Sequence, residues 1–146
     1  MDRSQARPKI LIVDDEPEVL ASLRDLLRPA YQVTACGNGE QAIAFLEAAP
    51  DVAVLISDQR MPGMSGVELL RRAKEIRPET SRLLLTAFSD ARTIIDAINQ
   101  GHVFRYITKP WEPGELEAAI DQGVERYQLI AERNRLVEEL KATNAK

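Results

Sequence analysis

Acidic residues follow two apolar stretches of this sequence, and a lysine follows a third. Asp14 and Asp15 end the first stretch, Asp58 ends the second and Lys109 follows the third. Carboxylate oxygens suit Mg²⁺, and a carboxylate can also attack phosphorus to form an acyl phosphate. A lysine and a threonine hydroxyl can neutralise or bond the phosphoryl oxygens. If these side chains meet in space, the chemistry open to them is Mg²⁺-dependent phosphoryl transfer to an aspartate.

Five stretches have the composition of β-strands, and they alternate with five stretches of helical spacing or composition. The strand candidates are residues 9–15, 31–36, 52–57, 82–88 and 103–108. The helix candidates are residues 17–28, 40–49, 66–76, 90–100 and 115 to about 143. This alternation predicts the α/β class, with a doubly wound five-stranded parallel sheet that carries helices on both faces.

A doubly wound sheet binds ligands beyond the carboxyl ends of its strands. The predicted strand ends carry Asp14, Asp15, Asp58, Thr86 and Lys109, which we therefore expect at one edge of the sheet. Close carboxylates repel one another unless a cation lies between them, and a small set of oxygen ligands favours Mg²⁺. Taken alone, the first two acids could simply cap the helix that follows them, and the threonine could be an ordinary strand residue.

The last helical stretch is longer than a small domain requires. At 1.5 Å per residue it would span roughly 40 Å, against ~30 Å for a small domain. It carries two apolar seams, one of Tyr127, Ile130, Asn134, Val137 and Lys141, the other of Leu129, Leu136 and Leu140. Asn at an inner position fixes pairing in parallel coiled coils, although two heptads fall short of the usual three or four. We expect a helix that forms a homodimer or links domains; a solvated helix is the alternative.

The composition is that of an ordinary globular chain, with 146 residues, 45% of them hydrophobic, and a net charge of −4. It fits one domain without a basic stripe, so we expect no direct contact with nucleic acid. Cys36 is single, which excludes an intramolecular disulfide, and no Cys/His set has zinc spacing. There is neither a membrane-length apolar run nor a signal-peptide core, so we expect a cytoplasmic protein without membrane contact.

Residues 8–125 resemble the receiver domain of two-component response regulators. The matching motifs are ILIVDDEP, VLISDQRMPGMSGVELL, LLLTA and VFRYITKPW, in the family's order. The resemblance implies the strand order 2-1-3-4-5 of the flavodoxin/CheY-like sheet. We expect three parts: a polar, disordered N-terminus at 1–7, the receiver domain at 8–125 that the resemblance implies, and an extension of the last helix at 126–146. The extension would be a coiled coil or a linker to an output domain beyond Lys146.

The resemblance also implies roles for the acids at the strand ends. Asp58 would accept the phosphoryl group from a histidine kinase or a phosphotransfer protein. Asp14 and Asp15 match the acids that bind Mg²⁺, with Asp58 itself and the backbone carbonyl of Arg60 as further ligands. Arg60 and Phe88 lie where the family varies, and we expect them to tune how fast the acyl phosphate hydrolyses.

Further matches concern the phosphate contacts and the switch. Lys109 would pair with the phosphate, and Pro110 matches a proline that is often preceded by a cis bond. Thr86 matches the switch hydroxyl, Ala87 the small residue that leaves room for the phosphate, and Tyr106 the aromatic that swings inward after the threonine moves. The implied output is not catalysis. It is a change in the face formed by the fourth helix, fifth strand and fifth helix, which the C-terminal helix passes on.

Two other functions fit parts of this pattern. An aspartate-nucleophile phosphatase would use the same chemistry, but such enzymes resemble a pattern with the nucleophile on the first strand and an acid two places later. A receiver-fold scaffold that no longer switches is disfavoured by the complete set of matching residues. The segment INQGHVFRYITKPW also resembles receivers joined to cyclic-dinucleotide phosphodiesterases, ATPase-driven transcription activators or signalling kinases, but no catalytic motif of these occurs in the sequence.

Overall fold

The computed structural model describes residues 7–87 and 91–144, which form one sheet with helices on both sides. The strands are β1 (Lys9–Val13), β2 (Gln32–Cys36), β3 (Val52–Asp58), β4 (Ser81–Thr86) and β5 (Arg105–Thr108). The helices are α1 (Pro17–Leu27), α2 (Gly39–Ala48), α3 (Gly66–Ile76), α4 (Ala91–Asn99) and α5 (Pro113–Asn144). The predictions for residues 1–6, for Phe88, for the helix start at Asp90 and for residues 145–146 lie outside the described residues.

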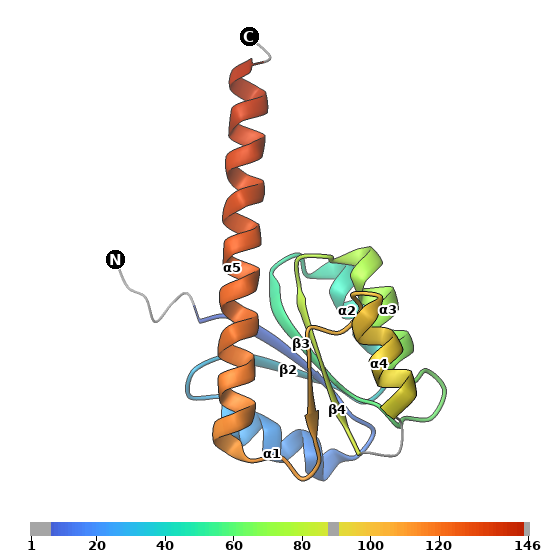
Figure 1. Cartoon of the computed structure of the whole chain (residues 1–146). Helices are drawn as coiled ribbons and strands as arrows, with labels where there is room; N and C mark the ends of the chain where they lie inside the picture. Colours follow the sequence, from blue (N-terminus) through green and yellow to red (C-terminus); the bar gives the residue numbers. More distant parts are fainter. Residues whose placement is uncertain (1–6, 88–90, 145–146) are drawn as a thin grey trace.

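The strands are all parallel and lie in the order β2-β1-β3-β4-β5, which confirms the predicted sheet (Figure 1). β1 lies between β2 and β3, with Val13 beside Cys36 on one side and Ser57 on the other. The connection after β1 goes to one side of that strand and the connection after β2 goes to the other. Ligand sites of such sheets form at this switch point, outside the carboxyl ends of the strands.

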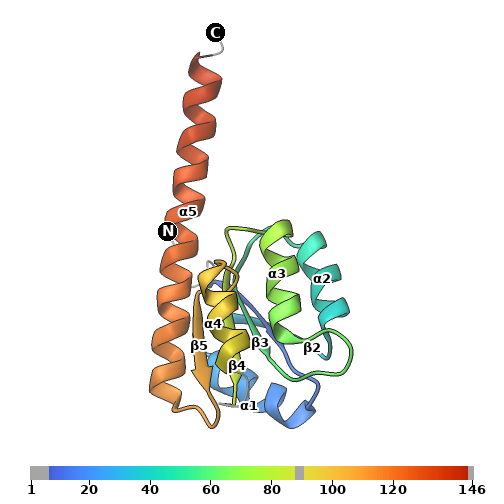
Figure 2. The same cartoon turned by 45° about the vertical axis from the view of Figure 1, so that its right-hand side comes forward.

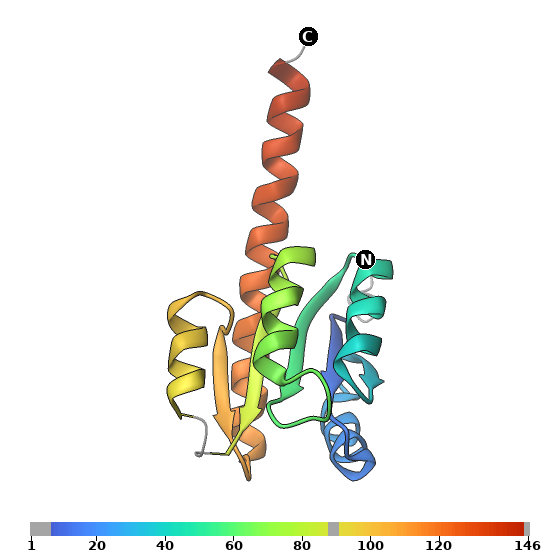
Figure 3. The same ribbon diagram turned by 90° about the vertical axis from the view of Figure 1, so that its right-hand side faces the viewer.

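Two hydrophobic layers fill the space between the sheet and its helices. α1 and α5 cover one face, with Leu23 and Leu116 in the core, while α2, α3 and α4 cover the other, with Leu46 and Leu69 (Figures 2 and 3). β1, β3 and β4 are buried along almost their whole length. Their sequences are rich in aliphatic residues because helices cover both faces of a parallel sheet.

One basic side chain is buried among the described residues. Arg82 in β4 donates hydrogen bonds of 2.8–3.2 Å to the carbonyl oxygens of Pro78, Thr80, Gly101 and His102. Burial lowers the pKa of this guanidinium to about 10, and the nearby charge of Arg126 adds to the decrease. The side chain therefore stays charged at neutral pH, and it ties the turn before β4 to the turn that ends α4.

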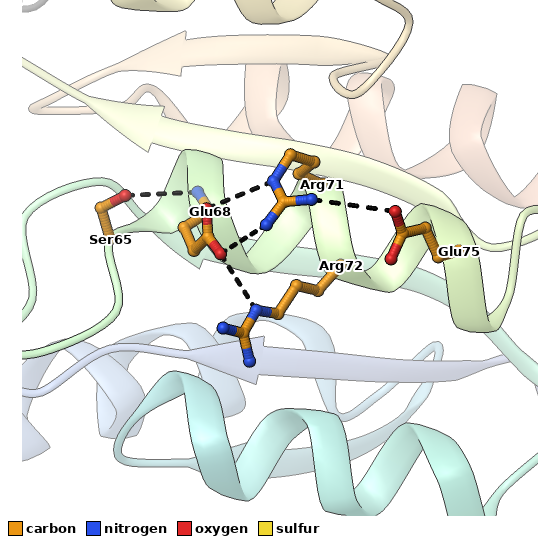
Figure 4. A network of polar contacts seen from close by, with 5 residues as sticks. All are labelled: Ser65, Glu68, Arg71, Arg72 and Glu75. Carbon is orange, nitrogen blue, oxygen red and sulfur yellow. Dashed lines mark hydrogen bonds and ion pairs between the residues drawn. The ribbon is translucent and has the colours of Figure 1, made fainter.

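α3 begins at a capped turn (Figure 4). Ser65 Oγ accepts a hydrogen bond from the backbone N–H of Glu68 at 3.2 Å, which is the serine half of a Ser-x-x-Glu capping box. The Glu68 carboxylate lies 2.6 Å from a guanidinium nitrogen of Arg71 and 3.0 Å from one of Arg72. The hydrogen bond from Arg71, followed by that from Arg72, lowers the pKa of Glu68. Arginines three and four residues further on thus attract this carboxylate.

α5 is one uninterrupted helix of 32 residues, and its C-terminal half stands clear of the sheet (Figure 1). Ser81 Oγ donates to the carbonyl of Gly123 at 2.7 Å, which fixes the first half to β4. A Cβ on Gly123 would lie 3.1 Å from Val54, so the glycine allows this close approach. In the second half, three leucines are 66%, 50% and 63% exposed: Leu129, Leu136 and Leu140.

None of the helices in the described part of the chain combines the length and the apolar composition that a bilayer-crossing helix needs.

Gly66 allows a test of how tightly α3 packs on β3. A Cβ at this position would lie 2.3 Å from the carbonyl oxygen of Asp58, and a backbone atom cannot move aside cheaply. We expect Gly66→Ala to lower the free energy of unfolding, measured by urea denaturation, by about 2 kcal/mol or more. Gly114→Ala is the control, because a Cβ there meets nothing within 4 Å. Equal losses in the two variants would contradict the close packing at Gly66.

Candidate functional site

Three carboxylates meet at the carboxyl ends of β1 and β3. Asp14 and Asp15 follow β1, Asp58 is the last residue of β3, and one oxygen of each lies within 4.8 Å of the others. The pairing of Val13 with Ser57 brings these positions side by side. Asp14 is fully buried, Asp58 is 7% exposed, and Asp15 is exposed. Two nearly buried acids thus lie beside a third that reaches solvent.

A lysine from the neighbouring loop completes this group of charges. Lys109 Nζ lies 2.5 Å from Asp58 Oδ1 and 3.6 Å from Asp14 Oδ2. Its backbone N–H donates to the carbonyl of Thr86 at 2.9 Å, and a cis peptide bond joins it to Pro110. Burial lowers the pKa of Lys109, but the hydrogen bond and charge of Asp58, together with the charge of Asp14, outweigh burial and raise it overall. The ammonium is therefore charged at neutral pH.

One buried oxygen of the cluster lacks a hydrogen-bond donor among the described residues. Asp14 Oδ1 accepts from the N–H of Glu16 at 2.8 Å, whereas the buried Oδ2 accepts no hydrogen bond. Burial raises the pKa of Asp14, and the charge of Asp58 raises it further, against the bond from Glu16. A buried oxygen without a donor is costly, and a hard cation with oxygen ligands would satisfy it. The residues present therefore fit a divalent cation.

The predicted switch residues lie on β4 and β5: Thr86 is the last residue of β4, and Tyr106 is the second residue of β5. Thr86 is buried, and its hydroxyl donates to the carbonyl of Ala87 at 2.7 Å rather than to a carboxylate. Tyr106 is 49% exposed. Between them lies a cavity of about 80 Å³, lined by Thr86, Ala87, Ala91, Ile94, Ile95, Tyr106 and Thr108. The tyrosine ring thus lies next to a mostly apolar space that it leaves open.

Three further residues, Arg60, Trp111 and Cys36, differ in their burial. Arg60 lies in the loop between β3 and α3 with its side chain exposed. Trp111 packs against the core face that α1 and α5 cover. Cys36 is buried, and burial raises the pKa of its thiol.

Motif reasoning misses Gln59, which directly follows Asp58. Its side chain is buried, and Oε1 accepts a hydrogen bond from the backbone N–H of Val67 at 2.8 Å. A single glutamine after a strand has no periodic or compositional signal. The contact spans eight residues of sequence, so only the folded chain shows it.

Known proteins share both the sequence pattern and the fold. Hydrogenase transcriptional regulatory protein HoxA of Bradyrhizobium diazoefficiens is 36% identical over 135 residues, which are 92% of this chain and 28% of that protein. A structure of adenylate cyclase from Rhodopirellula baltica has a TM-score of 0.87 at 35% identity, covering 90% of this chain and 98% of that one. A structure of a response regulator receiver domain protein from Clostridium thermocellum has a TM-score of 0.80 at 30% identity. That match covers 84% of this chain and 98% of the other.

The chain thus spans little more than a quarter of HoxA, at 28% of its length. The family model of the response regulator receiver domain matches residues 10–121. This range contains the three acids of the cluster and Lys109. The chain belongs to the response regulator receiver domain family.

Proposed function

We propose that Asp58 is the phosphoacceptor of this receiver domain, and that a histidine kinase or phosphotransfer protein of a bacterial two-component system is the donor. The observation that carries the proposal is the 2.5 Å ion pair between Lys109 and Asp58, beside two further carboxylates. In the transfer, a carboxylate oxygen of Asp58 bonds to phosphorus while the bond from phosphorus to the donor's histidine nitrogen breaks.

Mg²⁺ is the cation that we assign to the acidic cluster. Asp14, Asp15 and Asp58 would hold it, together with the backbone carbonyl of Arg60. These ligands are all oxygens and few in number, which suits an ion that keeps several waters and shares a carboxylate with a phosphate. When bound, the ion supplies positive charge to the oxygens of the phosphoryl group.

Three further residues would contact the transferred group. Lys109 is already 2.5 Å from the accepting carboxylate, so its ammonium can neutralise a phosphoryl oxygen without a large movement. The Thr86 hydroxyl would exchange its bond to the carbonyl of Ala87 for one to the phosphate. The small side chain of Ala87 leaves room for the phosphoryl oxygens.

We propose that this exchange operates a switch. When Thr86 moves towards the phosphate, Tyr106 can turn from its exposed position into the adjacent cavity of about 80 Å³. The face formed by α4, β5 and α5 then changes. Such a shift between two conformations needs only a few kcal/mol of differential binding.

The extended helix suggests how the change is passed on. We propose that residues 8–125 act as the receiver and residues 126–146 as a coiled coil or linker, in a cytoplasmic protein whose output lies in a domain beyond Lys146 or in a separate partner. The similarity to HoxA, a transcriptional regulatory protein, supports an output of this kind. The chain itself would be regulatory, without catalytic turnover and without direct contact with nucleic acid or membrane.

Labelling with a small phosphodonor tests the acceptor. Acetyl phosphate with Mg²⁺ should add one phosphoryl group to the wild type, detected by intact-mass spectrometry, and Asp58→Asn should abolish the addition. Asp51→Asn is the matched control, because Asp51 precedes β3 at the opposite edge of the sheet and pairs with Lys9. Labelling that survives in Asp58→Asn contradicts the assignment, and many turnovers on p-nitrophenyl phosphate would favour the phosphatase alternative.

Asp14→Asn should separate stability from cation binding. The variant removes a buried negative charge, so without Mg²⁺ we expect it to be more stable than the wild type by about 1 kcal/mol. Mg²⁺ at ten times its dissociation constant should stabilise the wild type by about 1.4 kcal/mol and the variant hardly at all. Urea denaturation measures both effects, with Glu47→Gln, an exposed acid of α2, as control. An equal response to Mg²⁺ in the two variants speaks against a cation at Asp14.

The exposed leucines of α5 predict self-association. We expect light scattering to show a homodimer at high protein concentration, and Leu136→Lys to shift the equilibrium towards monomer because the lysine would place charge on the seam. Ala142→Lys adds the same side chain at an exposed position off both seams, and it should leave the equilibrium unchanged. A wild-type chain that stays monomeric at every concentration contradicts the dimer. If the wild type is a dimer and beryllofluoride does not change its mass in light scattering, the non-switching scaffold is favoured.

A further inference from the structure

Gln59 connects the predicted phosphoacceptor to two neighbouring elements. Its backbone N–H donates to the carbonyl of Leu85 in β4 at 3.0 Å, and its own carbonyl accepts from the N–H of Gly66 at 3.0 Å. Its side-chain Oε1 accepts from the N–H of Val67 at 2.8 Å, while the residue is only 8% exposed. The backbone at Gln59, directly after Asp58, is therefore held on one side by β4 and on the other by α3.

The first turn of α3 depends on this residue for two of its hydrogen bonds. The first N–H groups of a helix have no partner within the helix, and side chains or neighbouring carbonyls must satisfy them. Here Gln59 accepts from Gly66 and Val67, and Ser65 Oγ accepts from Glu68. A cap normally comes from the residue at the helix start. Gln59 instead reaches the helix across the loop that contains Arg60.

Steric contact strengthens the same connection. A Cβ at Gly66 would lie 2.3 Å from the carbonyl oxygen of Asp58 and 2.9 Å from the Cα of Gln59. The start of α3 therefore rests directly on the peptide between these two residues. Backbone bonds, side-chain bond and close packing together leave this peptide little freedom to tilt.

We propose that Gln59 is a positioning residue for phosphoryl transfer, an inference that rests on the proposed role of Asp58. Its amide side chain fixes the backbone between the accepting carboxylate of Asp58 and the carbonyl of Arg60, the two groups on this segment that would hold the cation. Both oxygens must keep their separation and direction while phosphorus is attacked. Holding them in advance removes a reorganisation that would otherwise slow the reaction.

The test compares two ways of losing a hydrogen bond at the start of α3. Gln59→Leu removes the acceptor for Val67 N–H beside the accepting aspartate, and Gln59→Asn keeps an amide that is too short to reach it. Ser65→Ala removes the acceptor for Glu68 N–H on the same turn, while the acceptor for Val67 N–H stays in place. All four proteins are labelled with acetyl phosphate over a range of Mg²⁺ concentrations, well below their unfolding temperatures.

We expect both Gln59 variants to be labelled about tenfold more slowly than the wild type, because small misplacements of reacting groups cost rate steeply. The Mg²⁺ concentration that gives half the maximal labelling rate should be higher for both Gln59 variants than for the wild type. Mg²⁺ titrations without the phosphodonor, with the fluorescence of Trp111, the single tryptophan, as the signal, should show the same weaker binding. Ser65→Ala should unfold at a lower temperature yet keep the wild-type rate and Mg²⁺ dependence.

Two outcomes overturn the inference, and they differ from a failure of the proposed function. If the Gln59 variants are merely less stable and are labelled as fast as Ser65→Ala, the residue is only a helix cap. If Ser65→Ala slows labelling as much as they do, the effect belongs to the helix start as a whole. If the wild type is not labelled at all, the proposed role of Asp58 fails first, and the role of Gln59 fails with it.

Discussion

The attraction between the Lys109 ammonium and the Asp58 carboxylate holds together a group of charges that would otherwise separate. Three acids lie close together in this group, two of them almost buried, and one buried carboxylate oxygen has no donor among the described residues. One lysine cannot balance three carboxylates. The fold therefore maintains a site with excess negative charge. Because two of the acids are buried, water screens their repulsion poorly, and a bound cation would be strongly stabilised.

The surrounding structure shows how such a site can be maintained. The acids lie at the ends of β1 and β3, which are central strands with helices on both faces. The start of α3 is fixed to Gln59, the residue after Asp58, by hydrogen bonds from the N–H groups of Gly66 and Val67. Arg82 fixes two turns at the opposite edge of the sheet. Tyr106, by contrast, is half exposed beside an open cavity. The rigid part of the molecule thus holds the charges, and the part with free space lies where movement is proposed.

Much of this could be predicted from sequence, for identifiable reasons. Continuous aliphatic runs that alternate with helical patterns predict a parallel sheet with helices on both faces. An acid at the end of such a run must then lie at the carboxyl edge of the sheet, where ligands bind. Strand limits were less certain: β4 begins at Ser81 and β5 only at Arg105, because pairing with the neighbour, not composition, decides where a strand starts. Asp14 and Asp15 lie just beyond β1 rather than within it.

What sequence could not reveal depends on contacts between distant residues. Arg82 looks like a surface residue until four carbonyl oxygens are found around its guanidinium. The hydrogen bond from Val67 to Gln59, and the ion pairs that Arg71 and Arg72 both form with Glu68, also depend on side-chain positions that no periodic pattern predicts. The outward position of Tyr106 is of the same kind, since composition predicts only that the residue suits a strand.

The unbroken course of α5 has a consequence for anything bound to its far end. An α-helix turns once in about 3.6 residues and rises about 1.5 Å for each of them, so its length fixes an angular phase as well as a distance. Adding one residue to the exposed half would rotate an attached partner about the helix axis by about 100°. Adding seven residues would return the partner close to its original orientation. A small rotation of α5 about its axis at the point where Ser81 binds Gly123 would turn a partner attached at the other end of the helix by the same angle.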